Sequence, residues 1–182
     1  MLQLNQYGGN AERVDQAFKE PARSQRIQRP LPNTVLSQTD TDLKLFDALS
    51  SFKIYTNQVS MHLADGWRHR IFALLDDLYE PDSWDTDDKV TEMPAFKTFM
   101  KVILELQPTR LPGIGISSAG SLVAAWYLGE DRLTIICDAD DKVQFILSAS
   151  VDGDLESANV KTKASRISES LGPFRPERWL AV

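Results

Sequence analysis

The apolar residues of this chain change their spacing near residue 113, and that change constrains the fold more than any other feature. In residues 61–79 and 94–106 they recur every three or four positions, which is typical of helices with one buried face. Beyond residue 113 they alternate with polar residues in four short runs, which predicts four strands. These runs are 113–117, 121–128, 132–138 and 143–150. Because only three or four residues separate consecutive runs, we expect an antiparallel meander.

This order of elements predicts an α+β fold in which helices cover one face of the sheet. Alternation gives each strand a single apolar row, which we assign to the core side. In the second strand that row is Leu122, Ala124, Trp126 and Leu128. Its largest member, Trp126, is expected to be buried. A last covering helix is predicted over 156–171, because Val160, Ala164, Ile167 and Leu171 follow helical spacing and Gly172 comes next.

Two further elements are predicted ahead of residue 61. Thr39-Asp40-Thr41 is a helix-start signal, and apolar residues follow at helical spacing in Leu43, Phe46 and Leu49. Residues 52–59 alternate in part between apolar and polar side chains, which favours a strand.

Residues 1–42 differ in composition from the rest, and we interpret them as an N-terminal arm followed by a single domain over 43–182. The arm is rich in Gln, Asn, Arg and Pro and has few large apolar side chains. Such a segment cannot bury enough apolar surface to order itself. We therefore expect its order to come from the domain, a partner, or a second copy in a homo-oligomer.

Composition predicts a cytoplasmic protein. No apolar run approaches the roughly 18 residues that span a membrane, and the first residues lack the pattern of a secretory signal. Cys137 is the only cysteine among 182 residues, so neither an internal disulfide nor a multi-cysteine zinc site can form.

The formal net charge is −6, and the acidic residues concentrate in 76–92, where eight of them accompany a single Lys89. This stretch would repel phosphate backbones, so nucleic acid is not expected to bind the domain. It suits a basic protein partner instead. The candidate partner-binding residues are Asp76, Asp77, Glu80, Asp82, Asp85, Asp87 and Asp88. A solvated loop and a divalent metal site are the alternatives, although no glycine between 67 and 112 can form the turn of a calcium loop.

No arrangement of a nucleophile and a base stands out in the sequence. His62 and His69 lie two turns apart on one predicted helix, too far apart to share a metal ion. Cys137 falls on the apolar face of its strand, where a thiol behaves as a small hydrophobic group. Asp140 and Lys142 match the acid-x-Lys pair of some nucleases, but they fall where a hairpin must turn. We therefore predict no catalytic residue, metal or cofactor, which argues against an enzyme.

A pattern of short elements runs through residues 66–149. Its features are Ser83-Trp84-Asp85, the helix near 94–106, Pro112-Gly113-Ile114, Gly120 and Trp126. This pattern resembles a group of small uncharacterised bacterial proteins from mobile-element or defence-associated gene neighbourhoods. The chain departs from that group at Thr86-Asp87-Asp88, where a Gly-rich turn is usual. The resemblance implies an accessory or antitoxin-like protein, and it implies no catalytic residue.

The leading hypothesis is thus a non-enzymatic accessory protein that binds a basic protein through the acidic stretch 76–92. It would be antitoxin-like, or a component of a bacterial defence or mobile-element system. One alternative is a metal-dependent hydrolase or nuclease subunit that uses the acidic residues of 76–92 or 138–141. Another is a structural subunit of an oligomeric assembly in which the arm joins the copies.

Overall fold

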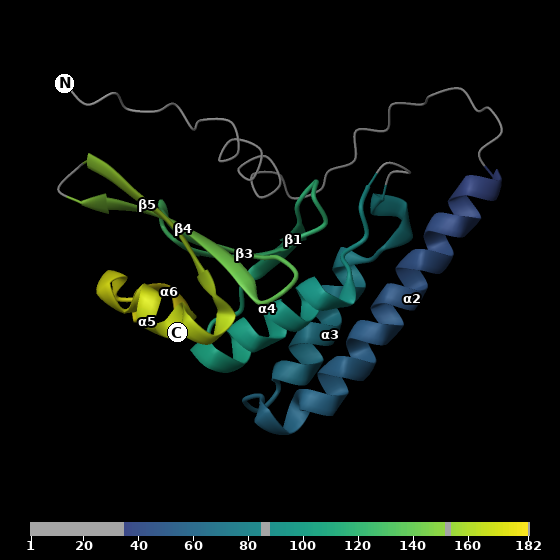
Figure 1. Cartoon of the computed structure of the whole chain (residues 1–182), viewed down its shortest axis with the longest axis horizontal. Helices are drawn as coiled ribbons and strands as arrows, with labels where there is room; N and C mark the ends of the chain where they lie inside the picture. Colours follow the sequence, from purple (N-terminus) through teal and green to yellow (C-terminus); the bar gives the residue numbers. More distant parts are fainter. Residues whose placement is uncertain (1–34, 85–87, 152–153, 182) are drawn as a thin grey trace. The chain divides into compact units, whose positions relative to one another are not determined.

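The computed structural model describes residues 35–84, 88–151 and 154–181 (Figure 1). The chain divides into two compact units, Met1–Thr34 and Val35–Val182, and every described residue belongs to the second. The predictions for residues 1–34 lie outside the described residues, as do Asp85 and Asp87. Within these ranges, no helix is both long and apolar enough to cross a membrane.

Three long helices form the helical layer of the domain. They are α2 (Val35–Val59), α3 (Trp67–Leu78) and α4 (Met93–Leu106). Short 3-10 turns, η1 (Ser60–His62) and η2 (Pro81–Ser83), follow α2 and α3. Helix α4 lies against the sheet, and α2 forms the outer edge of the layer (Figure 1). The helix predicted over 94–106 is therefore confirmed in α4.

Five antiparallel strands form one sheet in the order β1-β2-β3-β4-β5. The strands are β1 (Gly113–Ile116), β2 (Leu122–Leu128), β3 (Asp131–Cys137), β4 (Lys142–Val151) and β5 (Asp154–Lys163). The first four match the predicted meander closely, so the α+β class is confirmed. The prediction of only four strands is wrong.

The fifth strand replaces the first half of the helix predicted over 156–171. Residues 154–163 pair with β4 along its whole length. In this stretch Ala158, Val160 and Thr162 alternate with Ser157, Asn159 and Lys161. This two-residue period favours a strand, and a strand here also pairs the edge that β4 would otherwise leave open. Together these two effects outweigh the helical spacing of apolar residues that begins at Val160.

The chain becomes helical only after β5, in four short elements. These are η3 (Ala164–Arg166), α5 (Ile167–Leu171), η4 (Gly172–Phe174) and α6 (Glu177–Leu180). Ala164, Ile167 and Leu171 are fully buried, so the later part of the predicted apolar face does pack into the core.

The strand predicted over 52–59 is also wrong, because these residues continue α2. Phe52 and Thr56 lie one turn apart on the buried face of that helix. The Phe52 ring stacks on Phe96 of α4, with 4.2 Å between the ring centroids. Burial against α4 thus stabilises the helix more than the β-branched and aromatic residues of 52–59 favour a strand.

The helix predicted over 61–79 is shorter than expected. Gly66 adopts a positive φ of 75° and precedes the first turn of α3, so the helical run begins at Trp67. His62 consequently belongs to η1 and His69 to α3. The prediction that the two histidines lie on one helix is therefore wrong.

The core lies between the helices and one face of the sheet. Trp126 is only 1% exposed, as predicted, and its indole Nε1 donates a 2.9 Å hydrogen bond to the Arg110 carbonyl oxygen. Leu128 is the exception in the predicted inward row, because it ends β2 at the turn and is 38% exposed.

Candidate functional site

The predicted partner-binding residues that the structure describes lie in one continuous segment. These are Asp76 and Asp77 in the last turn of α3, Glu80 and Asp82 at η2, and Asp88 beyond it. All five side chains are exposed. We call this set the acidic surface.

The two carboxylates of the acidic surface that lie on α3, Asp76 and Asp77, are only partly compensated. Lys53 of α2 donates to Asp76 Oδ1 at 2.5 Å and neutralises part of one charge. The last turn of α3 contains no basic residue. Because a helix C-terminus carries partial negative charge, Asp76 and Asp77 stand where carboxylates lower helix stability.

A groove of about 320 Å³ borders the acidic surface. Its lining includes Leu78, Trp84, Asp88, Lys89, Ile116 and Ser117. Trp84 is half-buried and held in place, since its Nε1 donates a 2.9 Å hydrogen bond to the Leu78 carbonyl oxygen. Its ring stacks on Tyr79 at 5.4 Å between centroids. The groove therefore combines a fixed aromatic ring with acidic and basic side chains.

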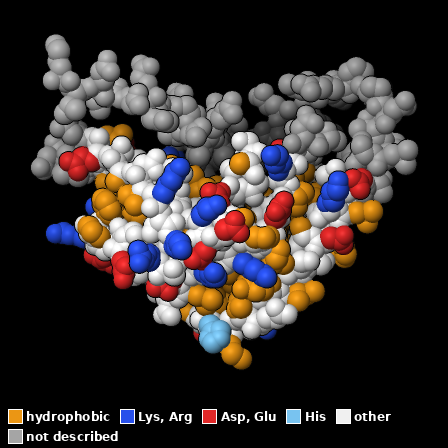
Figure 2. Space-filling view, in the orientation of Figure 1, with side chains coloured by type: hydrophobic (Ala, Val, Ile, Leu, Met, Phe, Trp, Pro, Cys, Tyr) orange, Lys and Arg blue, Asp and Glu red, His pale blue; other side chains and the backbone are white. Residues whose placement is uncertain are grey.

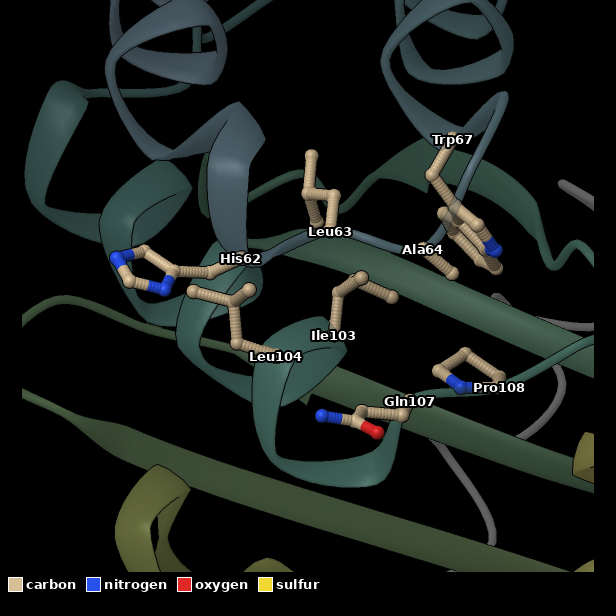
Figure 3. A pocket seen from close by; sticks show the side chains of 8 residues that line it. All are labelled: His62, Leu63, Ala64, Trp67, Ile103, Leu104, Gln107 and Pro108. Carbon is tan, nitrogen blue, oxygen red and sulfur yellow. The ribbon is translucent and has the colours of Figure 1, made fainter.

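A second pocket lies where the connection from η1 to α3 passes the C-terminal end of α4 (Figure 3). In this view His62 lies at one side, Pro108 at the other, and Ile103 between them. Its volume of about 10 Å³ is at the lower limit of the space that holds one water molecule. This pocket is thus a packing gap and not a ligand site.

The two histidines do not form a site together. His62 borders the small pocket, while His69 lies with Asp65 and Arg68 beside a separate shallow groove of about 270 Å³. Both side chains are exposed. Across the described ranges, no group of three or more His, Cys, Asp or Glu side chains is placed to hold a metal ion.

Cys137 is fully buried, as predicted. Burial raises the pKa of its thiol far above the ordinary range, and the neighbouring Asp138 carboxylate raises it further. The thiol therefore stays protonated and is not a nucleophile. Asp138 itself accepts a hydrogen bond from the Ser121 hydroxyl, which links the start of β2 to the end of β3.

The acid-x-Lys pair lies in the β3–β4 hairpin turn, as the turn interpretation predicted. Asp140 and Asp141 both adopt positive φ, 60° and 64°, and the Lys142 N–H donates to the Ala139 carbonyl oxygen at 3.4 Å. This is the geometry of a type I′ turn. Lys142 Nζ lies 3.9 Å from Asp140 Oδ2, with both side chains mostly exposed.

Of the residues that line the groove, only Asp88 was predicted as a site residue. Lys89 and Leu78 flank the acidic residues, but Ile116 and Ser117 come from the end of β1. The Trp-Asp pattern was the one local signal for this place, and only the tertiary fold brings β1 to it.

Comparisons of the chain with protein-family models, with curated proteins and with solved structures find no match. The resemblance of residues 66–149 to the small bacterial proteins therefore stays a prediction.

Proposed function

We propose that this chain is a non-enzymatic protein that binds a basic protein partner through the acidic surface. The observation that carries the proposal is the position of Asp76 and Asp77 in the last turn of α3, with Glu80 two residues beyond it. Carboxylates there cost the helix a few tenths of a kcal/mol or more each. Local conflicts of this kind are typical of functional surfaces, where binding compensates for lost stability.

The neighbouring groove supports the same proposal. Trp84 is anchored by its hydrogen bond to Leu78, so its ring loses little conformational freedom when a partner docks. Fixed aromatic residues are common anchors of protein interfaces, and an indole face also attracts Lys and Arg side chains. The surrounding carboxylates would steer a basic partner toward this ring and raise the association rate.

An antitoxin-like role, or a role in a defence or mobile-element system, is a narrower form of this proposal. Its support is the resemblance of residues 66–149 alone. The nuclease alternative has a weaker structural basis, because Asp140 and Lys142 lie on an exposed hairpin turn.

Affinity capture from cell extract with three versions of the full chain tests the proposal. The test variant is Asp77→Asn, Glu80→Gln and Asp82→Asn, which removes three exposed charges of the acidic surface. The matched control is Glu105→Gln, Glu130→Gln and Glu156→Gln, which removes three exposed charges elsewhere. We expect the wild type and the control to retain the same basic protein and the test variant to lose it.

Salt dependence gives a second criterion for the captured complex. Raising salt from about 50 to about 500 mM should weaken binding mainly by slowing association, because exposed charges are screened. Equal capture by all three versions, or an affinity that does not change with salt, would contradict the proposal that the acidic surface binds the partner. A rise in melting temperature on adding Mg²⁺ or Ca²⁺ would instead favour the metal-dependent alternative.

A further inference from the structure

Large apolar side chains are unusually exposed along one side of α2 and its extension η1. Leu43 is 58% exposed, Phe46 65%, Ile54 59% and Met61 81%. At 3.6 residues per turn, Leu43, Phe46 and Ile54 lie within about 80° of one another around α2, with Ser50 between Phe46 and Ile54, and Met61 follows in η1. Figure 2 shows hydrophobic side chains along the outer edge of the molecule over α2. We call this set of five residues the outer stripe.

The outer stripe is separate from the face that α2 uses within the domain. Leu45, Phe52 and Thr56 are buried at 1% exposure or less, and they point to the opposite side of the helix. Helix α2 packs with that buried side against α3 and α4. It therefore has two apolar faces, of which the outer one is open to solvent. An exposed apolar face of several hundred Å² on one helix is a candidate interaction surface.

We propose that the outer stripe pairs with the same stripe of a second copy of this chain, with the two α2 helices antiparallel and a two-fold axis near Ser50. Around such an axis, residues equally distant from Ser50 meet. Phe46 then packs on Ile54 of the partner subunit, and Leu43 lies opposite Asn57 of the partner subunit. Ser50 is small, so the two helices can approach closely where they cross.

The charges along α2 select the antiparallel orientation. The first half contains Asp40, Asp42 and Asp47 with Lys44, a net charge of −2, whereas residues 48–62 contain only Lys53 as a formal charge, +1. Lys53 is already paired with Asp76, so the orientation depends on the acidic halves: antiparallel pairing keeps them apart and opposes the two helix dipoles. Parallel pairing would bring the two acidic halves together.

The exposed area of the outer stripe is large enough for a second copy to bind, but only reversibly. The four large side chains expose roughly 500 Å² per copy, so pairing removes about 1,000 Å² from water, near the lower limit of specific interfaces. We therefore expect a dissociation constant in the micromolar range. This interface uses none of the five carboxylates of the acidic surface, so the inference stands apart from the proposed function.

Sedimentation velocity of the full chain over about 1–200 µM tests the pairing, because this range brackets a micromolar equilibrium. We expect a monomer–dimer equilibrium in the wild type. Phe46→Glu and Ile54→Glu should each raise the dissociation constant at least tenfold. Leu155→Glu, at a 73% exposed position on β5, should leave it unchanged. Equal melting temperatures would show that the variants remain folded.

Cysteine cross-linking tests the orientation, and Cys137 does not interfere because it is fully buried. Oxidised Ser50→Cys should form a covalent dimer across the two-fold axis. Leu43→Cys mixed with Asn57→Cys should also cross-link, whereas neither should cross-link by itself. A wild type that stays monomeric up to the highest concentration, or a dimer that Phe46→Glu leaves intact, would overturn the proposal. Self-cross-linking of Leu43→Cys would overturn the antiparallel orientation.

Discussion

Arg178 Nη2 donates a 2.6 Å hydrogen bond to Oδ2 of Asp131 and thereby joins α6 to the first residue of β3. The other carboxylate oxygen of Asp131 accepts a 2.8 Å hydrogen bond from the backbone N–H of Ser150 in β4. The Asp131 side chain is 11% exposed, and the Arg178 guanidinium lies 5.1 Å from the Trp179 ring centroid. One carboxylate thus connects two strands and the C-terminal helix.

Asp131→Ala should lower the free energy of unfolding by about 1–3 kcal/mol, since it removes two hydrogen bonds and leaves the Ser150 N–H without its acceptor. Arg178 is 42% exposed, so solvent screens part of the ion pair and keeps the loss below that of a fully buried pair. Urea unfolding measures the effect. Asp40→Ala is the control, because Asp40 and Lys44 are each 65% exposed and their pair should contribute less than about 1 kcal/mol. Equal losses in the two variants would contradict the structural role of Asp131.

Trp126→Ala should cost about 3–5 kcal/mol of unfolding free energy, as large aromatic truncations do in cores. The side chain is 1% exposed and also donates to the Arg110 carbonyl oxygen. Trp126→Phe keeps much of the apolar contact and should cost less. Leu128→Ala, on the same strand but 38% exposed, is the control and should cost under about 1 kcal/mol. A small loss for Trp126→Ala in chemical denaturation would mean that this face of β2 is not the core.

The elements that could be predicted from the sequence are those in which local signals agree. The meander is the main example, because alternating strands and short polar turns indicate the same hairpins. The turn at residues 139–142 adds two residues that tolerate positive φ, Asp140 and Asp141. In α4 the two signals also agree, because Pro94 in the first turn and the apolar face that follows both indicate a helix over the same residues.

The elements that could not be predicted depend on partners distant in sequence. Residues 52–59 are helical because Phe52 stacks on Phe96, 44 positions later, and residues 154–163 form a strand because β4 offers them an edge. The acidic surface could be read from composition alone. Its groove could not, since Trp84 and Ile116 lie 32 positions apart in the sequence and line the groove together only in the folded chain.

Gly66 should be sensitive to substitution for a conformational reason alone. Its φ is 75°, and an added Cβ would meet no atom within 4 Å. Gly66→Ala should therefore lower stability by about 1 kcal/mol through backbone strain, without any steric clash. Gly66→Asn offers the matched control at the same position, because Asn adopts positive φ more readily than Ala. Gly66→Asn should therefore lose less stability than Gly66→Ala in thermal unfolding. A stabilising Gly66→Ala would show that the break before α3 is not strained.

Tyr79 should make the domain sensitive to alkaline pH. Its side chain is 3% exposed, packed against Phe52 and Trp84, and burial raises its pKa from 10.0 to about 12. Thr91 lies near enough to lower the pKa slightly, yet neither hydroxyl makes a hydrogen bond of normal geometry.

Between pH 10 and about 12 the unfolded chain releases the Tyr79 proton while the folded chain retains it, so stability falls as pH rises. The stability that is fully present below pH 10 should decrease by about 2–3 kcal/mol on reaching pH 12. Tyr79→Phe removes this group, so urea unfolding across the same pH range should show a smaller fall than in the wild type. At pH 7 the variant should be as stable as the wild type or slightly more so, because a buried hydroxyl without a partner is lost. Tyr55→Phe serves as the control and should retain the alkaline fall. If Tyr79→Phe retained the same fall as Tyr55→Phe, another group would have to account for the alkaline loss.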